Sequence, residues 1–243
     1  MVDPLFQVKV KCINCDSTFL TSRVRPSFKK PVGKDSDFYA HYKEINPEYY
    51  VVRVCNYCGF ASTESFHTRI TLSQRQAFME KIGNKWTNRD YSGERNWQQA
   101  LETFQLALLC AQIKEEKSRV IAGILHHIAW LYRERGDKEM ENRFLQFALD
   151  AYIESFKEED GDELNARLMY MIGELNRRLK NYYEAVKWFG RVINDKRIMD
   201  AGMIKLSREM WATTREDMLA EKLELPDEMK EQESSPIITV KRG

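Results

Sequence analysis

The spacing of apolar residues separates the chain into two parts. From about Ile70 onward, apolar positions recur with the period of an amphipathic helix, and no proline occurs again until Pro226. Because proline interrupts helices, this long stretch without it favours stacked helices. Glycine, asparagine and aspartate mark the breaks between them. The pattern predicts helices at 71–83, 94–114, 118–135, 138–157, 162–179, 182–194 and 198–222.

The first 68 residues have a different pattern, rich in β-branched and aromatic residues. Runs at 17–24 and 49–54 are typical of strands. Turn signals at Pro26, Pro31 and Pro47 fall between these runs. This region is therefore predicted to consist of strands and loops, with an extended insert over residues 25–47.

The helical part carries an internal repeat. Small residues of one helix are followed by large residues of the next, as in tetratricopeptide repeats, where the small residue lets the helices approach closely. The copy with the clearest pattern has Gly173 followed by Ala185 and Phe189, and a weaker copy has Ala129 followed by Leu145. The spacing between copies exceeds the usual 34 residues. We therefore predict a tetratricopeptide-like domain with longer helices or loops.

Composition and charge favour a folded protein of the cytoplasm. Hydrophobic residues make up 43% of 243 residues, enough for a core, and the net charge of +1 gives no strong overall attraction to nucleic acid or membranes. No run of about 18 uncharged apolar residues occurs, and the first residues lack the apolar core of a signal peptide. We expect cytoplasmic localisation and no contact with membranes.

Four of the five cysteines form two pairs, Cys12 with Cys15 and Cys55 with Cys58. Two residues between thiolates let both sulfurs face one ion, and Gly59 permits a tight turn behind the second pair. In a reducing compartment, such pairs indicate metal ligands rather than disulfides. The sequence predicts one structural Zn²⁺ site, with iron or redox-active thiols as alternatives.

The predicted metal site argues against catalysis. Four sulfur ligands complete a tetrahedral zinc site and leave no position for water or substrate. No nucleophile motif, phosphate-cradling glycine loop or spaced carboxylate pair stands out in the sequence. Cys110 lies in an apolar helical stripe and is expected in the core. We therefore expect a protein that is not an enzyme.

A basic and aromatic set of side chains is expected on one concave face if the tetratricopeptide register holds. This set comprises His126, Trp130, Arg133, Arg167, Tyr170 and Arg177. Arginine forks and exposed rings suit an acidic peptide or a C-terminal carboxylate. Alternatively, Trp130 and Tyr170 pack between helices and the arginines are solvated.

A second candidate surface is basic and lies near the first cysteine pair. Its members are Lys9, Lys11, Arg23, Arg25, Lys29, Lys30 and Lys34. Zinc ribbons often contact nucleic acid, and basic side chains near Phe19 and Phe28 would suit phosphates and bases. Alternatively, these residues form a solvated face, because several carboxylates follow directly in the sequence.

Several motifs together resemble those of a known family. They are Cys12-x-x-Cys15, Asp37-Phe38, Tyr42, Asn46-Pro47-x-Tyr49-Tyr50 and Val54-Cys55-x-x-Cys58-Gly59-Phe60-Ala61. Over about residues 5–220, the chain is similar to a bacterial family of uncharacterised cytoplasmic proteins, classed as a domain of unknown function. The resemblance implies a zinc-ribbon-like N-terminus joined to a tetratricopeptide-like C-terminus, without an established activity. Asp16 stands where a glycine is common.

Together these patterns predict a mainly α protein with three parts. Residues 1–68 form a zinc-ribbon-like, β-rich module, residues 69–225 a tetratricopeptide-like helical domain, and residues 226–243 a flexible tail. The expected function is that of a zinc-binding adaptor, whose helical groove binds an unknown, acidic protein or peptide. The alternative is a nucleic-acid-binding regulator that uses the basic zinc ribbon, with an affinity that falls steeply with salt.

Overall fold

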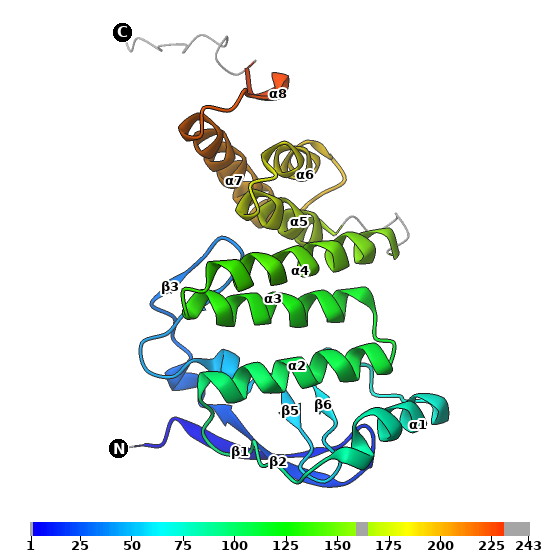
Figure 1. Cartoon of the computed structure of the whole chain (residues 1–243). Helices are drawn as coiled ribbons and strands as arrows, with labels where there is room; N and C mark the ends of the chain where they lie inside the picture. The colour runs from blue at the N-terminus through cyan, green and yellow to red at the C-terminus, as the bar shows by residue number, and fades with distance from the viewer. Residues whose placement is uncertain (1, 159–164, 231–243) are drawn as a thin grey trace. The chain divides into compact units, whose positions relative to one another are not determined.

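The computed structural model describes residues 2–158 and 165–230 and is mainly helical, with short antiparallel strand pairs near the N-terminus (Figure 1). Contacts divide the chain into two compact units, residues 1–159 and 160–243. The strands are β1 (Leu5–Lys11), β2 (Thr18–Val24), β3 (Gly33–Lys34), β4 (Ala40–His41), β5 (Arg53–Val54) and β6 (Ala61–Ser62). The helices are α1 (Leu72–Lys81), α2 (Trp97–Ile113), α3 (Ser118–Glu134), α4 (Lys138–Glu158), α5 (Ala166–Arg178), α6 (Tyr182–Asn194), α7 (Ala201–Ala220) and α8 (Asp227–Lys230).

The strands form three separate two-stranded pairs, β1 with β2, β3 with β4, and β5 with β6. The first pair is the longest, with a register that runs from Leu5 opposite Val24 to Lys11 opposite Thr18. Strand β2 confirms the prediction for 17–24, whereas β1 was not predicted. The first cysteine pair lies in the turn between β1 and β2, and the second lies between β5 and β6.

The strand predicted at 49–54 is wrong for most of its length. Residues Pro47–Tyr50 form a 3₁₀ turn, and only Arg53–Val54 is a strand. Pro47 occupies the first turn, where its fixed φ angle suits a helical conformation. The side chain of Asn46 accepts a hydrogen bond from the backbone N–H of Glu48 at 3.0 Å and so caps this turn. Local capping therefore prevails over the β-forming side chains.

The seven predicted helices correspond to α1 to α7, with ends that differ by a few residues. Residues 162–164 of the fifth prediction lie outside the described part. Capping boxes fix two of the starts, Thr71 with Gln74 before α1 and Asn96 with Gln99 before α2. No helix in the described ranges combines the length and apolar character needed to span a membrane.

In the first unit, α2, α3 and α4 lie side by side in that order, and α2 packs on β6 (Figure 1). One continuous core extends from the cysteine pairs through Phe60 and Phe78 to Phe104 and Leu131. The ring centroids of Phe60 and Phe78 are 5.1 Å apart, and this contact connects α1 with the segment of the second cysteine pair. The strands and the first helices therefore share one core, and the module boundary predicted at residue 68 stays a prediction.

The second unit contains α5, α6 and α7, which pack against one another. A Cβ atom at Gly173 would lie 2.8 Å from the ring of Phe189, so these helices approach as closely as the repeat pattern requires. This small-to-large contact is confirmed, while the tetratricopeptide assignment stays a prediction. Within the predicted tail, Asp227–Lys230 form α8 and Met229 is buried; residues 231–243 lie outside the described part.

Candidate metal centre and basic pocket

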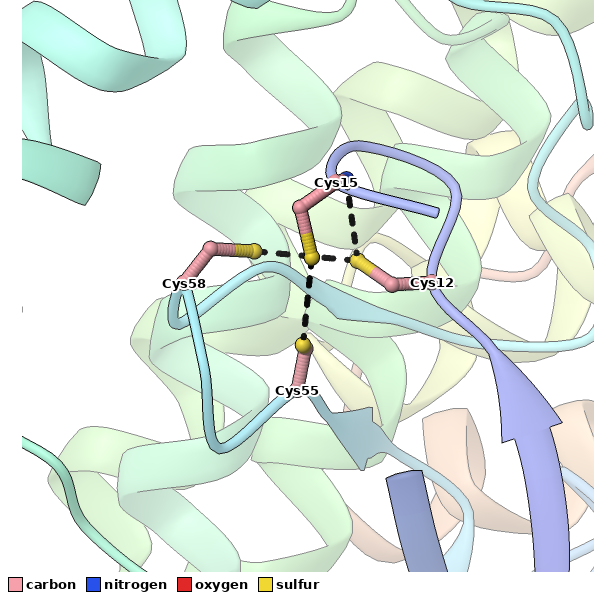
Figure 2. A group of neighbouring side chains, drawn as sticks. All are labelled: Cys12, Cys15, Cys55 and Cys58. Carbon is pink, nitrogen blue, oxygen red and sulfur yellow. Dashed lines mark hydrogen bonds between the residues drawn. The ribbon is translucent and has the colours of Figure 1, made fainter. Parts of the chain in front are cut away.

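The two cysteine pairs form one four-cysteine cluster. The sulfurs of Cys12, Cys15, Cys55 and Cys58 lie within 4.8 Å of one another and point toward a common centre (Figure 2). The Sγ atoms of Cys12 and Cys58 are 3.6 Å apart, and those of Cys15 and Cys55 are 3.7 Å apart. Tetrahedral zinc with Zn–S bonds of about 2.3 Å places its sulfurs about 3.8 Å apart. The cluster could therefore bind one metal ion through four thiolates.

Each cysteine pair lies in the same kind of turn. The amide of Asp16 donates to the carbonyl of Cys12 at 3.2 Å, and the amide of Gly59 donates to the carbonyl of Cys55 at 2.8 Å. Asp16 and Gly59 both have positive φ angles, 62° and 78°. We call these turns the first knuckle, residues 12–17, and the second knuckle, residues 55–60. Matching turns aim both sulfur pairs at one centre.

Neighbouring groups hold the cluster in place. The side-chain amide of Asn14, in the first knuckle, donates to the Sγ of Cys58, in the second, at 3.7 Å. Trp86 donates from Nε1 to the carbonyl of Asn56 at 2.9 Å and so supports the second knuckle. Cys110 is fully buried, as expected of a core residue, and its sulfur accepts a hydrogen bond from the amide of Ala61 at 3.4 Å.

The thiols of the cluster perturb one another. Side-chain hydrogen bonds with Cys55 and Cys58, together with burial, raise the pKa of Cys12. Hydrogen bonds from Cys12 and Cys58 lower the pKa of Cys55, because they stabilise its thiolate. Metal binding requires thiolates, so a bound cation would replace the protons that these sulfurs share.

A family model described as "Uncharacterized protein conserved in bacteria (DUF2225)" matches residues 5–214. The chain belongs to this family. No curated protein matches the chain. The DUF2225 match extends from β1 into α7 and includes both knuckles, so it confirms the resemblance to an uncharacterised bacterial family. The description of this family names no activity.

Three of the predicted groove residues surround Asp37, a carboxylate of the insert. Asp37 is fully buried, and Arg133 donates to its Oδ1 at 2.9 Å and its Oδ2 at 2.6 Å. Trp130 donates from Nε1 to Oδ2 at 3.1 Å, and Nε2 of His126 lies 3.2 Å from the same oxygen. We call these four residues the Asp37 network. The carboxylate that these three residues contact thus belongs to the chain itself, whereas the prediction was for the carboxylate of an external peptide.

The charges of the Asp37 network are balanced locally. Burial alone would lower the pKa of Arg133, but hydrogen bonds and charge from Asp37 and Glu141 raise it, so the guanidinium stays charged. Arg133 also contacts Glu141 and Asp35, each at 2.7 Å. Burial lowers the pKa of His126, which favours its neutral form beside Asp37. These side chains fasten the insert to α3.

The other three groove residues lie in the second unit. Tyr170 is fully buried beside Phe189, with ring centroids 5.8 Å apart. Arg177 contacts Glu174 on its own helix at 2.9 Å and Asp217 on α7 at 2.7 Å. Arg167 is exposed on α5. Most of these six side chains are buried or bound within the chain, so the geometry does not favour partner binding there. Partner binding by the six residues stays a prediction.

A pocket of about 470 Å³ opens in the first unit, between β2, the insert, β5 and the start of α3. We call it the basic pocket. Its charged lining comprises Arg23, Lys29, Arg53, Arg119, Glu48 and Glu64, together with His127. Sequence reasoning did not find this site, because its lining comes from segments far apart in the chain. The one local signal was Gly123, a glycine inside a predicted helix, which lines the pocket without a side chain.

One side of the basic pocket holds a contact between a histidine and a carboxylate. Nδ1 of His127 lies 2.6 Å from Oε2 of Glu48, and the His127 ring stacks on Phe104 at a centroid distance of 5.3 Å. Burial alone would raise the pKa of Glu48, but the charge and hydrogen bond of His127, together with the charge of Lys29, lower it overall. Glu48 is therefore a carboxylate. His126 and His127 contact different acids, as expected for adjacent residues on a helix.

The predicted basic surface near the first cysteine pair is partly neutralised. Lys11 pairs with Asp16 at 3.0 Å, and Arg23 pairs with Glu64. Nε of Arg25 donates to the carbonyl of Asp3 at 2.8 Å. Only Arg23 and Lys29 of the seven basic residues also line the basic pocket.

Proposed function

We propose that this protein is a cytoplasmic, zinc-stapled adaptor, which binds an acidic partner protein and catalyses no reaction. The observation that carries the proposal is the four-cysteine cluster, whose sulfur separations suit tetrahedral zinc and whose members belong to the core of the first unit. Four thiolates occupy every position of tetrahedral zinc, so the ion would contribute to folding rather than to chemistry. A reducing cytoplasm would keep these thiols available for the metal.

The basic pocket supports the second half of the proposal. Four cationic side chains and two carboxylates line it, so the positive charge exceeds the negative charge by two without counting His127. The predicted groove, in contrast, already contains Asp37. An acidic group of a partner would therefore find its counter-charges in the basic pocket rather than at Arg133.

Affinity capture tests the adaptor proposal. The tagged full-length protein is incubated with cytoplasmic extract of its own bacterium, with and without nuclease treatment, beside an Arg119→Glu variant. Arg119 is exposed in the basic pocket, so charge reversal should spare the fold and abolish capture of a specific protein. Arg197→Glu, at an exposed arginine of the second unit, is the matched control and should capture the same protein as the wild type.

Two results would contradict the proposal. Equal capture by wild type and Arg119→Glu would exclude the basic pocket as the partner site. Capture that is lost on nuclease treatment would instead support the alternative, a nucleic-acid-binding regulator. That alternative has weaker support, because Lys11 and Arg25 are already engaged by acidic or carbonyl groups.

A further inference from the structure

The cations of the basic pocket come from several elements. Arg23 lies on β2, Arg53 on β5 and Arg119 in the first turn of α3, while Lys29 belongs to the insert. A carboxylate has two oxygens in one plane and a single negative charge, and one guanidinium fork can occupy both oxygens. A phosphate has three terminal oxygens and nearly two negative charges at neutral pH, so it can accept from several donors that approach from different sides. The excess of two positive charges matches such a dianion.

Arg53 shows that this charge is incompletely compensated. Its Nη2 donates to the carbonyl of Thr63 at 3.0 Å, but its Nε is buried and has no hydrogen-bond partner in the described part of the chain. Burial lowers the pKa of Arg53; the charge of Glu64 opposes this shift only in part, and the nearby charge of Arg23 adds to it. Burying a charged group whose donors are incompletely paired is costly, so an anion in the pocket would stabilise the Arg53 guanidinium through its charge.

The pocket is too large for phosphate alone. Its volume of about 470 Å³ lies within the range of small-molecule sites. Val24, Val51, Val120 and Ile124 contribute an apolar wall, and Tyr42 and Tyr50 add rings. A Cβ atom at Gly123 would meet nothing within 4 Å, so the helix leaves this wall open. The lining therefore suits an anionic group attached to an apolar or aromatic body.

We propose that the basic pocket recognises a phosphate monoester carried on an aromatic or apolar body. This inference rests on the proposed function in one respect, that the pocket is a binding site. It adds the chemical class of the ligand. The phosphate contacts the arginines, and the body lies against the valine and isoleucine side chains. The source is either a phosphorylated side chain of a partner protein or a small phosphorylated molecule.

Calorimetric titration of the full-length, zinc-loaded protein with phenyl phosphate and phenylacetate tests this chemistry. The two probes share a ring and differ in the anionic group. At matched ionic strength, phenyl phosphate should bind at least about tenfold more tightly, because its second charge and third oxygen engage further guanidinium donors. Equal affinity for the two probes, or no binding of phenyl phosphate, would overturn the inference.

Variants locate the binding. Arg119→Gln removes an exposed cation and should weaken phenyl phosphate binding about tenfold. Gly123→Leu keeps every charge but places a large side chain in the space of the pocket, so it should abolish binding. Gly123→Ala should bind like the wild type. Arg197→Gln in the second unit is the charge control and should leave the affinity unchanged. Wild-type affinity in both Arg119→Gln and Gly123→Leu would exclude this pocket.

Peptide probes separate this inference from the proposed function. A phosphotyrosine peptide that binds more tightly than phenyl phosphate supports both the inference and the adaptor role. Tighter binding of phenyl phosphate than of the peptide supports the inference and a small-molecule source, and removes the pocket from the adaptor proposal. A glutamate-rich peptide that binds as tightly as the phosphopeptide supports the adaptor and overturns the phosphate assignment.

Discussion

The two knuckles have the same backbone turn but different surroundings. In each, the residue after the second cysteine has a positive φ angle and donates its amide to the carbonyl of the first cysteine. In each, the amide of the first cysteine donates to the carbonyl five residues later, Cys12 to Ser17 and Cys55 to Phe60, both at 2.9 Å. The turn geometry is thus common to both, and the difference lies in what covers it.

The left-handed position is exposed in the first knuckle and covered in the second. Asp16 is exposed and pairs with Lys11 at 3.0 Å and Arg75 at 3.7 Å. Gly59 lies against Trp86, and a Cβ atom there would overlap the indole ring. Aspartate tolerates the left-handed region when solvent surrounds it. The packing of Trp86, rather than the backbone angle alone, therefore requires glycine in the second knuckle.

Loss of one cysteine of the cluster is expected to have the largest effect, because both knuckles share the same metal site. Cys55→Ser should abolish zinc binding and lower the free energy of unfolding by on the order of 5 kcal/mol, because structural metal binding contributes directly to folding. Metal analysis of the purified protein and urea unfolding measure the two effects. Wild-type protein should contain one zinc ion per chain and lose stability on chelation.

Cys110→Ser is the matched control for this loss. Cys110 is buried near the second knuckle but lies outside the cluster. Its replacement should lower stability moderately and leave the zinc content unchanged. Full zinc content in Cys55→Ser, or loss of zinc in Cys110→Ser, would contradict the ligand assignment.

Substitutions at Gly59 and Asp16 compare the stability cost at the same backbone position of the two knuckles. The positive φ angle and the overlap with Trp86 should together lower the free energy of unfolding by about 3 kcal/mol. Asp16→Ala tests the same backbone position without the overlap and should cost less. Thermal or urea unfolding of both zinc-loaded variants measures the difference.

A double-mutant cycle separates backbone strain from steric overlap. In a Trp86→Ala background, the overlap is absent, so Gly59→Ala should cost only about 1 kcal/mol, which is the left-handed strain. An undiminished cost in that background would show that Trp86 does not determine the glycine requirement. The first knuckle offers no such coupling, because Asp16 has only exposed ion-pair partners there.

Features set by local sequence were predictable. The cysteine spacing predicted the four-cysteine cluster, and the helix starts follow from caps such as Thr71 and Asn96, which act within three residues of the chain. The contact between Gly173 and Phe189 also follows from a pattern that joins consecutive helices. The strand predicted at 49–54 failed for a local reason as well, because the capped turn at Pro47 was not recognised.

Features set by long-range charge pairing were not predictable from these patterns. Asp37 and Arg133 are separated by 96 residues in the sequence, and Glu48 and His127 also come from segments far apart in the chain. Three of the predicted groove residues on α3 contact the carboxylate of Asp37, and periodicity cannot say whether such a carboxylate comes from another molecule or from the insert. The basic pocket was missed for the same reason, since its cations come from four separate segments.

Asn14→Leu is expected to have the smallest effect on folding, and it tests whether one knuckle supports the other. Its amide reaches Cys58 across the cluster and also contacts the sulfur of Met79, and its Oδ1 is buried without a hydrogen-bond partner among the described residues. Leucine therefore removes favourable and unfavourable interactions together. Stability of the zinc-loaded protein should change little, while zinc affinity falls about tenfold in competition with a chelator, because the thiolate loses a hydrogen bond. Tyr57, at the equivalent position of the second knuckle, is 64% exposed, so Tyr57→Leu should leave zinc affinity unchanged. Equal affinities in the two variants would show that the knuckles contribute independently to the metal centre.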